Sequence, residues 1–183
     1  MLGAFHPGRL RSAGFSLVEL IITIVILSIV LAMAMPSITE WIQNGQIRTA
    51  AESAKNGLQL ARMEAVKRNS PVSFTLTNLG AVGGTGWTVV RVQTGEVIQA
   101  KPDGEGSNNV VLIATPGGAT TVTFTGLGRR QAANADGSAV LTMVQADNSS
   151  LTAPRRLNVT ISVGGEIRTC DPIVTDAGDP RAC

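Results

Sequence analysis

The stretch Arg9-Leu-Arg-Ser-Ala-Gly14-Phe15-Ser-Leu-Val-Glu19-Leu leads directly into an apolar segment that reaches Pro36, and this arrangement decides the fold. Two arginines precede a hydrophobic run of membrane length, and the run contains one carboxylate, that of Glu19. A charged side chain inside such a run costs about 2.5–3.5 kcal/mol on insertion scales. Glu19 is therefore expected to serve a function.

The apolar run predicts a membrane-spanning helix. Within residues 17–35 only Glu19, Thr23 and Ser28 are polar, and about 20 residues of this kind cross a bilayer as a helix. Pro36 follows and has no N–H to donate to the helical ladder. We therefore expect a kink or a local loosening of the helix at Pro36.

Basic residues predict the orientation of this helix. Arg9 and Arg11 precede it and no basic residue occurs from Ser12 to Ile47, so the amino terminus is expected in the cytoplasm. The Ala32-Met-Ala34 pattern leaves an alternative open, a conventional secretory signal that is cut after the run. That alternative requires an unusually long apolar run and gives the glutamate no purpose.

A second helical pattern continues after Pro36 without a linker. Apolar residues recur at three- and four-residue steps and define one stripe. The stripe is rich in alanine, so the helix is expected to lie close to a sheet, and Asn69-Ser70-Pro71 predicts its end. A single helix from Phe15 to about Asn69 would be roughly 80 Å long. The stripe comprises Ile38, Trp41, Ile42, Ile47, Ala50, Ala51, Ala54, Leu58, Ala61 and Ala65.

From Val72 onwards the pattern has a period of two. Short runs rich in Val, Thr and Ile alternate with Gly, Asn and Asp clusters, which predicts strands separated by turns. The hairpin signal Ser162-Val-Gly164-Gly165-Glu-Ile predicts a two-residue turn that pairs 157–163 with 166–170. We expect an α+β fold, with the long helix packed on a small antiparallel β-sandwich. The predicted strands are 72–77, 87–93, 97–101, 110–114, 120–125, 139–145, 157–163 and 166–170.

Composition limits the possible functions. With 183 residues the chain allows one globular domain and an appendage. Of its 15 basic residues, Arg9 and Arg11 are lost if the chain is cut after Gly14, and the remaining 13 balance the 13 acidic ones. Binding of nucleic acid would then need a local cluster of charge. The only histidine, His6, lies in the same segment, and nothing that remains resembles a nucleophile with its base, so we expect no enzyme.

Cys170 and Cys183 are the only cysteines. An even number near the end of an exported chain predicts one disulfide. A metal site is the alternative, but two thiolates without a histidine do not supply four ligands. Asp171, Asp176 and Asp179 offer oxygen ligands for Ca²⁺, although their contexts are also ordinary turn sequences. We therefore expect no metal and no cofactor.

The segment from Arg9 to Glu19 resembles the class III signal of type IV pilins and of type II secretion pseudopilins. In that family a prepilin peptidase cuts between the glycine and the phenylalanine, here Gly14 and Phe15, and methylates the new amino terminus. The resemblance implies that Glu19 meets the amino terminus of a neighbouring subunit, and pilin helices often carry a proline where Pro36 stands. It implies a leader over 1–14, a transmembrane half-helix over 15–36, an amphipathic half-helix over 37–70 and an antiparallel β domain over 71–183.

Within that family the chain resembles the minor subunits FimT and FimU and the pseudopilin GspH. The resemblance rests on the short chain, the β-rich pattern and the C-terminal segment 165–183. It implies a structural and assembly subunit of a pilus, held in the bacterial inner membrane with its C-terminal domain in the periplasm, and later part of the extracellular filament. The implied partners are the prepilin peptidase and other minor and major pilins. A pseudopilin of type II secretion remains an alternative.

DNA uptake is a further alternative, since some FimT proteins bind incoming DNA through a C-terminal Gly-Arg-x-Arg motif on a β-hairpin. Gly165 and Arg168 match this motif, whereas Glu166 occupies the first arginine position and would repel phosphate. Solvated surface arginines are the simpler interpretation, because this half of the chain has almost no aromatic side chains for base stacking. The other arginines expected in a DNA-binding patch are Arg129, Arg130, Arg155, Arg156 and Arg181.

Overall fold

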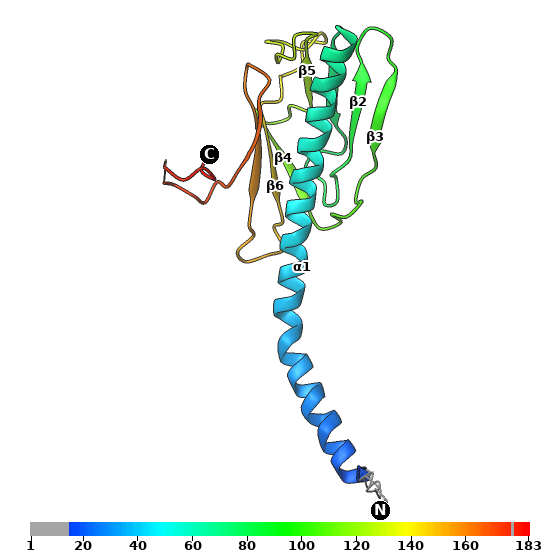
Figure 1. Ribbon diagram of the computed structural model, residues 1–183, viewed down its shortest axis with the longest axis vertical. Helices are drawn as coiled ribbons and strands as arrows, with labels where there is room; N and C mark the ends of the chain where they lie inside the picture. The colour runs from blue at the N-terminus through cyan, green and yellow to red at the C-terminus, as the bar shows by residue number, and fades with distance from the viewer. Residues whose placement is uncertain (1–14, 177) are drawn as a thin grey trace, which may run out of the picture. The chain divides into compact units, whose positions relative to one another are not determined.

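The computed structural model describes residues 15–176 and 178–183. One long helix, α1 (Leu17–Arg68), comes first and eight strands follow it. The chain divides into two compact units between Thr39 and Glu40, within this helix. The second unit contains the rest of α1 and all of the strands (Figure 1). The prediction of one long helix packed on antiparallel strands is confirmed.

The strands form two antiparallel sheets of four strands each. The first sheet has the order β3-β2-β1-β5 and the second has the order β4-β6-β7-β8. Their strands are β1 (Val72–Leu76), β2 (Trp87–Arg91), β3 (Val97–Lys101), β4 (Val111–Thr115), β5 (Thr121–Phe124), β6 (Met143–Asp147), β7 (Leu157–Ile161) and β8 (Ile167–Cys170).

The apolar stripe of α1 is covered only from Ile47 onwards. Ile47 and Leu58 are fully buried, as are the alanines between Ala50 and Ala65 that the stripe predicts. The stripe was expected to begin at Ile38, and that part is wrong, because Trp41 is 76% exposed. The helix is hydrogen-bonded to a loop of the second sheet at Gln43, whose side-chain oxygen accepts from Asn148.

A close approach at Gly57 sets the distance between α1 and the first sheet. A Cβ atom on Gly57 would lie 2.7 Å from Cε2 of Phe74 and 2.9 Å from the indole ring of Trp87. The two rings pack against each other with centroids 5.8 Å apart. Small residues in this part of the stripe therefore allow the helix to rest directly on aromatic side chains.

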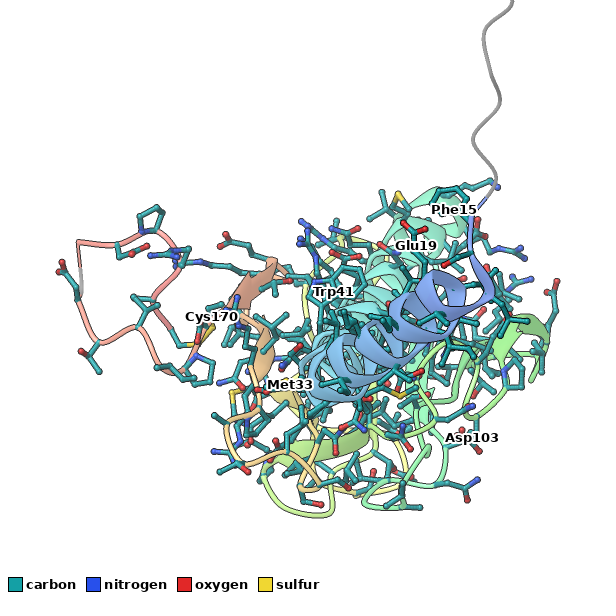
Figure 2. All side chains as sticks on the ribbon, turned by 90° about the horizontal axis from the view of Figure 1, so that it is seen from below. Phe15, Glu19, Met33, Trp41, Asp103 and Cys170 are labelled. Atoms are coloured by element: carbon teal, nitrogen blue, oxygen red, sulfur yellow. A yellow bond between two sulfur atoms is a disulfide. The ribbon has the colours of Figure 1, made fainter. Side chains whose placement is uncertain are left out.

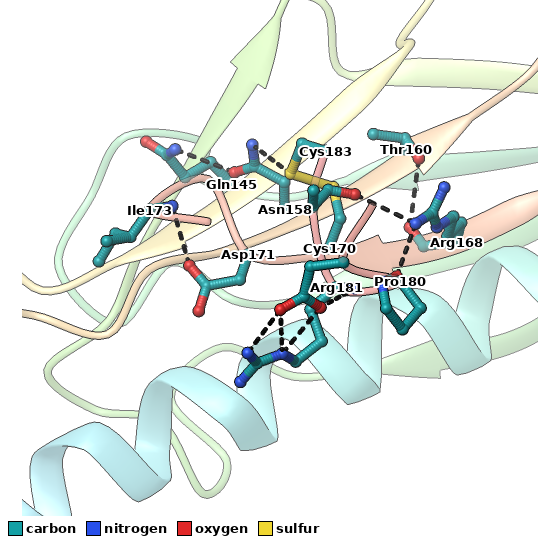
Figure 3. The surroundings of a disulfide bond; sticks show 12 residues. Gln145, Asn158, Thr160, Arg168, Cys170, Asp171, Ile173, Pro180, Arg181 and Cys183 are labelled. Carbon is teal, nitrogen blue, oxygen red and sulfur yellow. Dashed lines mark hydrogen bonds and ion pairs between the residues drawn. A yellow bond between two sulfur atoms is a disulfide. The ribbon is translucent and has the colours of Figure 1, made fainter. Parts of the chain in front are cut away.

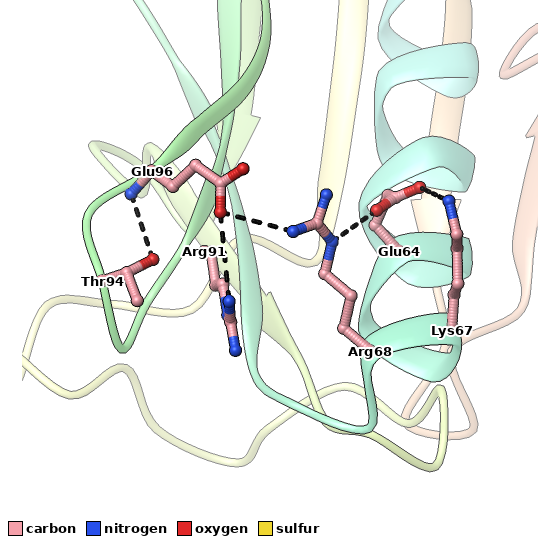
Figure 4. A network of polar contacts seen from close by, with 6 residues as sticks. All are labelled: Glu64, Lys67, Arg68, Arg91, Thr94 and Glu96. Carbon is pink, nitrogen blue, oxygen red and sulfur yellow. Dashed lines mark hydrogen bonds and ion pairs between the residues drawn. The ribbon is translucent and has the colours of Figure 1, made fainter.

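The predicted end of the helix at Asn69 is confirmed. Asn69 has a φ of 45°, and the N–H of Ser70 donates to the carbonyl of Ala65 at 3.1 Å. A residue in the left-handed region that returns N–H groups to the last carbonyls is a common helix stop. Arg68, the last helical residue, contacts Glu64 and also Glu96 on the β2–β3 turn (Figure 4).

Residues 139–142 join the two sheets, and this corrects one predicted strand. The N–H of Leu141 donates to the carbonyl of Thr121 in β5, and the N–H of Thr142 donates to Thr115 in β4. The carbonyl of Thr142 accepts from Ile161 in β7. The pattern had predicted a strand over 139–145, whereas β6 begins at Met143 because the preceding residues connect three other strands.

The β7–β8 hairpin is present, but its turn is one residue longer than predicted. Ile161 pairs with Ile167, and the N–H of Ser162 donates to the carbonyl of Glu166 at 3.0 Å. Three residues therefore lie between the bonded positions, and the last of them, Gly165, has a φ of 81°. Three-residue hairpin loops commonly place a glycine in this left-handed conformation.

Candidate functional site

The large apolar side chains of residues 17–35 lie uncovered on α1. Each is more than half exposed, from 52% for Val25 to 77% for Met33, which is labelled in Figure 2. Every buried Leu or Ile side chain gains about 1.5–3 kcal/mol relative to water, so this surface requires an apolar environment. By length and composition, α1 is the one helix among the described residues that can cross a membrane.

Among residues 17–35, Glu19 is the one polar side chain that has no hydrogen bond to any part of the chain that the structure describes. Thr23 donates its hydroxyl to the carbonyl of Leu20 at 2.8 Å, and Ser28 donates to Ile24 at 2.7 Å. Hydroxyls bonded to the helix backbone in this way are satisfied without a partner chain. The carboxylate of Glu19 has no such bond and no ion pair within the described residues, so it remains available to another group.

Ser16 begins the helix, and sequence reasoning missed its role. The N–H of Glu19 donates to the Ser16 hydroxyl at 3.1 Å, which makes Ser16 the N-cap. Ser16-Leu-Val-Glu19 has the S-x-x-E spacing of a capping box, a signal that is visible in the sequence. The cap places the glutamate in the first turn, where the helix dipole favours a negative charge. It also explains why α1 begins at Leu17 and not at the predicted Phe15.

The residues predicted for processing flank this cap. Phe15 precedes the helix and is 80% exposed, so the position next to the expected cut lies outside regular structure. Gly14 lies outside the described residues. Cleavage at this position stays a prediction.

Pro36 lies within α1, which continues through it. The hydroxyls of Ser37 and Thr39 donate to the carbonyls of Ala34 and Met35 at 2.9 and 3.0 Å. The division between the two units falls one helical turn after Pro36, at Thr39. The expected kink stays a prediction, and so does a role of Pro36 in assembly.

Arg168, the matched arginine of the DNA-binding motif, holds the C-terminal loop. Its Nη2 atom donates to the carbonyl of Pro180 at 2.6 Å and to that of Ala182 at 3.1 Å (Figure 3). The loop is closed by the predicted disulfide between Cys170 and Cys183. The guanidinium therefore already has acceptors within the chain, although the side chain is exposed.

Two further arginines of the expected patch are paired with carboxylates. Arg156 contacts Asp147 at 2.9 Å. Arg181 contacts Asp179 at 2.7 Å and, chiefly through its side-chain hydrogen bonds, lowers the pKa of that carboxyl to about 2. The aspartate is thus committed to an arginine, and no group of three or more metal-binding side chains occurs among the described residues.

The remaining arginines, Arg129, Arg130 and Arg155, lie on loops that contact α1 at two distant points. Arg130 donates its backbone N–H to Val163 at 3.2 Å, whereas the backbone N–H of Arg155 donates to Asn44 on α1. The turn before Arg129 contacts α1 through Arg62, which donates to the carbonyl of Gly128 at 3.1 Å. From Asn44 to Arg62 the helix rises about 27 Å. The predicted DNA-binding arginines therefore do not gather into one patch.

The fold itself requires glycine at position 165. A Cβ atom there would collide with the carbonyl oxygen of Gly128, because the β7–β8 hairpin packs against the turn that follows β5. Its φ of 81° also disfavours other residues. The glycine of the matched motif is thus required by the fold, whether or not anything binds to the hairpin.

Two family comparisons match this chain. The family described as "Type II transport protein GspH" matches residues 50–165, and the "Prokaryotic N-terminal methylation motif" matches residues 9–35. The first covers most of the β domain, and the second covers the predicted processing site and the apolar run. No curated protein matches the chain.

Solved structures of one other protein are similar. Two crystal structures of the type IV minor pilin FimU from Pseudomonas aeruginosa align with TM-scores of 0.47 and 0.48, at 17% and 18% identity. The alignments cover 70% and 67% of this chain and 90% of each FimU chain.

Proposed function

Because the chain belongs to the GspH family of minor type IV pilins and pseudopilins, we propose that it is a structural and assembly subunit of a type IV pilus. It matures by cleavage between Gly14 and Phe15, which removes a leader over 1–14. The prepilin peptidase and other minor and major pilins are its partners. The family is one of structural pilins, and the chain acts by assembly and not as an enzyme.

One observation carries this proposal: the exposed, mostly apolar first half of α1 begins with a capped glutamate that has no hydrogen bond or ion pair within the described residues. Before assembly the inner membrane covers residues 17–35, with the β domain in the periplasm. In the filament the corresponding helices of other subunits cover the same surface. Since lipid and neighbouring helices are similarly apolar, moving between them gains little from the hydrophobic effect.

Glu19 then supplies the selectivity that apolar contacts lack. Removal of the leader leaves a free ammonium on Phe15, about one helical turn from the Glu19 carboxylate. A pair between this carboxylate and the amino terminus of a neighbouring subunit is strong in a low dielectric, although desolvation offsets part of the gain. An unpaired glutamate in the same place would be costly, so the pair fixes the stagger between helices.

Mass spectrometry of the native protein's amino terminus tests the maturation step. We expect the chain to begin at a methylated Phe15. A chain that still begins at Met1, or that begins beyond Ala34, would contradict the proposal. Deletion of the gene separates the two assembly systems, because a pilus subunit causes loss of pili and a pseudopilin causes a secretion defect.

DNA uptake is the alternative that the arginine geometry supports least. Arg156 and Arg181 are paired with carboxylates, and Arg168 is bonded to two carbonyls. A DNA-binding pilin would show normal pili, poor transformation and binding that weakens as salt increases. Loss of that binding on Arg129→Gln, a side chain with no ion pair within the described residues, would favour it over the assembly role.

A further inference from the structure

Four exposed apolar side chains occupy the end of the domain where α1 finishes. They are Met63 and Val66 on α1, Leu127 on the turn after β5, and Val163 on the β7–β8 hairpin, with exposed fractions of 61%, 51%, 82% and 60%. We call them the Leu127 patch. None of them belongs to the core, and exposed apolar side chains that gather in one place usually mark an interaction site.

The three segments that carry the Leu127 patch contact one another. A Cβ atom on Gly128 would lie 3.0 Å from Cγ2 of Val66, and Arg62 donates to the carbonyl of the same glycine at 3.1 Å. The backbone N–H of Arg130 donates to Val163 at 3.2 Å. The patch therefore lies on three segments that pack against one another.

Positive charge surrounds this patch. The segments 62–68, 125–130 and 163–166 contain two carboxylates, of Glu64 and Glu166. Glu64 is already paired with Lys67 and Arg68, and Arg68 also contacts Glu96 on the β2–β3 turn. Arg129 has no ion pair within the described residues. The five cations of these segments are Arg62, Lys67, Arg68, Arg129 and Arg130. A partner should present apolar side chains and a carboxylate.

The same chain carries a surface of that kind at the other end of the domain's helix. Trp41 is 76% exposed, Ile42 is 49% exposed, and the neighbouring Glu40 is exposed with no ion pair among the described residues. About 35 Å of helix separate Glu40 from Met63. Two complementary surfaces at opposite ends of one molecule allow copies of the chain to bind head to tail. Such copies form an open filament, unless the rotation between neighbouring copies closes them into a ring.

We propose that the Leu127 patch docks onto residues 40–42 of a second copy of this chain. Leu127 and Met63 cover Trp41, and Arg129 pairs with Glu40. The proposal rests on the proposed function, because an open head-to-tail contact extends a filament. Nucleic acid fits this surface less well, since the patch offers no aromatic side chain on which bases could stack.

Crosslinking of two differently tagged full-length chains, expressed together in cells that assemble the filament, tests the contact. One chain carries Trp41→Cys and the other carries Leu127→Cys, and a short bis-maleimide joins free thiols only. Val97→Cys replaces Leu127→Cys in the control, since Val97 is 59% exposed on the edge strand β3. We expect the Trp41→Cys and Leu127→Cys pair to give a mixed dimer at least about tenfold above this control, and Trp41→Cys chains alone to give none.

Charge reversal then tests the pairing. Glu40→Lys in the first chain should lower the mixed-dimer yield by about tenfold, and Arg129→Glu in the second chain should restore it. The proposal is overturned if the Trp41→Cys and Leu127→Cys pair gives no more mixed dimer than the Val97→Cys control. It is also overturned if Arg129→Glu does not restore the yield that Glu40→Lys lowers. Binding of duplex DNA by the full-length wild-type chain that is lost on Leu127→Cys, with no crosslink between Leu127→Cys and Trp41→Cys chains, overturns it as well. Mass spectrometry of the same samples keeps the two proposals apart: a chain that begins at Phe15 and enters filaments without crosslinking contradicts only the docking contact.

Discussion

The indole N–H of Trp87 donates a hydrogen bond to the hydroxyl of Ser53 at 3.0 Å. This bond joins the first residue of β2 to the middle of α1, one turn before Gly57. The indole ring lies so close to the helix that a Cβ atom on Gly57 would be 2.9 Å from it. A buried Trp N–H usually needs such a partner, so the bond and the glycine together hold the helix against the first sheet.

Gly57→Ala should destabilise the domain although alanine is the better helix former. The added methyl would lie under 3.0 Å from both aromatic rings, and overpacking of this kind costs about 1–3 kcal/mol. Alanine recovers up to about 1 kcal/mol of helix propensity, which leaves a net loss. We expect a lower thermal midpoint for the full-length protein in detergent, followed by circular dichroism.

Gly45→Ala is the matched control on the same helix. A Cβ atom on Gly45 meets nothing within 4 Å, so the substitution should stabilise by about 0.5–1 kcal/mol. A Gly57→Ala protein that melts at or above the wild-type temperature would contradict the close approach.

Asp103 ties together three backbone segments near the first sheet. Its carboxylate accepts from the N–H of Gly86 at 2.7 Å and from the side chains of Thr77 and Asn78. Burial by itself raises the pKa of this carboxyl, but the hydrogen bonds, led by that of Gly86, outweigh burial and leave the pKa below its ordinary value. Asp103 thus connects the end of β1 with the start of β2.

The stabilisation by Asp103 should disappear in acid. A carboxyl whose pKa is lowered on folding stabilises the protein above the unfolded pKa of about 4, and this contribution is lost as the pH falls through the folded value. Asp103→Asn should therefore lower the free energy of unfolding by about 1 kcal/mol at pH 7. Below pH 4 the variant and the wild type should be equally stable. Thermal melts between pH 7 and 2.5 measure this.

Asp136→Asn serves as the control, because Asp136 bonds only to Ser138 within its own turn. Its substitution should change the melting temperature less than Asp103→Asn does. If the melting temperatures of the wild type and of Asp103→Asn differ by the same amount at every pH, the charge of Asp103 does not stabilise the loops.

Arg168→Gln should loosen the C-terminal loop without breaking its disulfide. The guanidinium bonds to two carbonyls of that loop, and glutamine cannot reach both. The loop's backbone is also held by the N–H of Asp171, which donates to Arg181 at 2.7 Å. We expect that amide to exchange about tenfold faster in the variant, as seen by hydrogen exchange with mass spectrometry.

Arg155→Gln provides the comparison, since Arg155 makes a hydrogen bond only through its backbone N–H within residues 15–176 and 178–183. Exchange at Asp171 should be unchanged in that variant. Equal exchange in all three proteins would mean that the disulfide alone orders the loop.

Local patterns predicted most of the fold, and contacts between distant segments account for the rest. The alanine-rich stripe and the stop at Asn69 follow from periodicity and end signals, and the structure agrees with both. The exposure of Trp41 depends on where the β domain begins to cover α1, which no local pattern encodes. The start of β6 at Met143 likewise depends on residues that bond to three other strands.

The site was only partly predictable, because some of its features are local in sequence and others depend on which side chains the fold brings together. Glu19 stands out as a charge in an apolar run, and its Ser16 cap was visible in the S-x-x-E spacing. The arginines were different, because a sequence does not say which carboxylate or carbonyl an arginine will meet. The Arg156–Asp147 pair forms where β6 ends and β7 begins, next to the paired residues Ala146 and Leu157, so it depends on the register between these two strands.

Replacing Glu19 by valine should separate membrane insertion from assembly. Insertion becomes easier by about 2.5–3.5 kcal/mol, and cleavage after Gly14 should remain largely intact because the leader is unchanged. Incorporation into filaments should fall about tenfold or more, since the free amino terminus of the neighbouring subunit loses its carboxylate. Thr23→Val is the control, because that hydroxyl bonds only to its own helix. Quantitative immunoblots of the membrane and sheared filament fractions measure both steps, and normal incorporation of the Glu19→Val chain would leave the glutamate with no part in assembly.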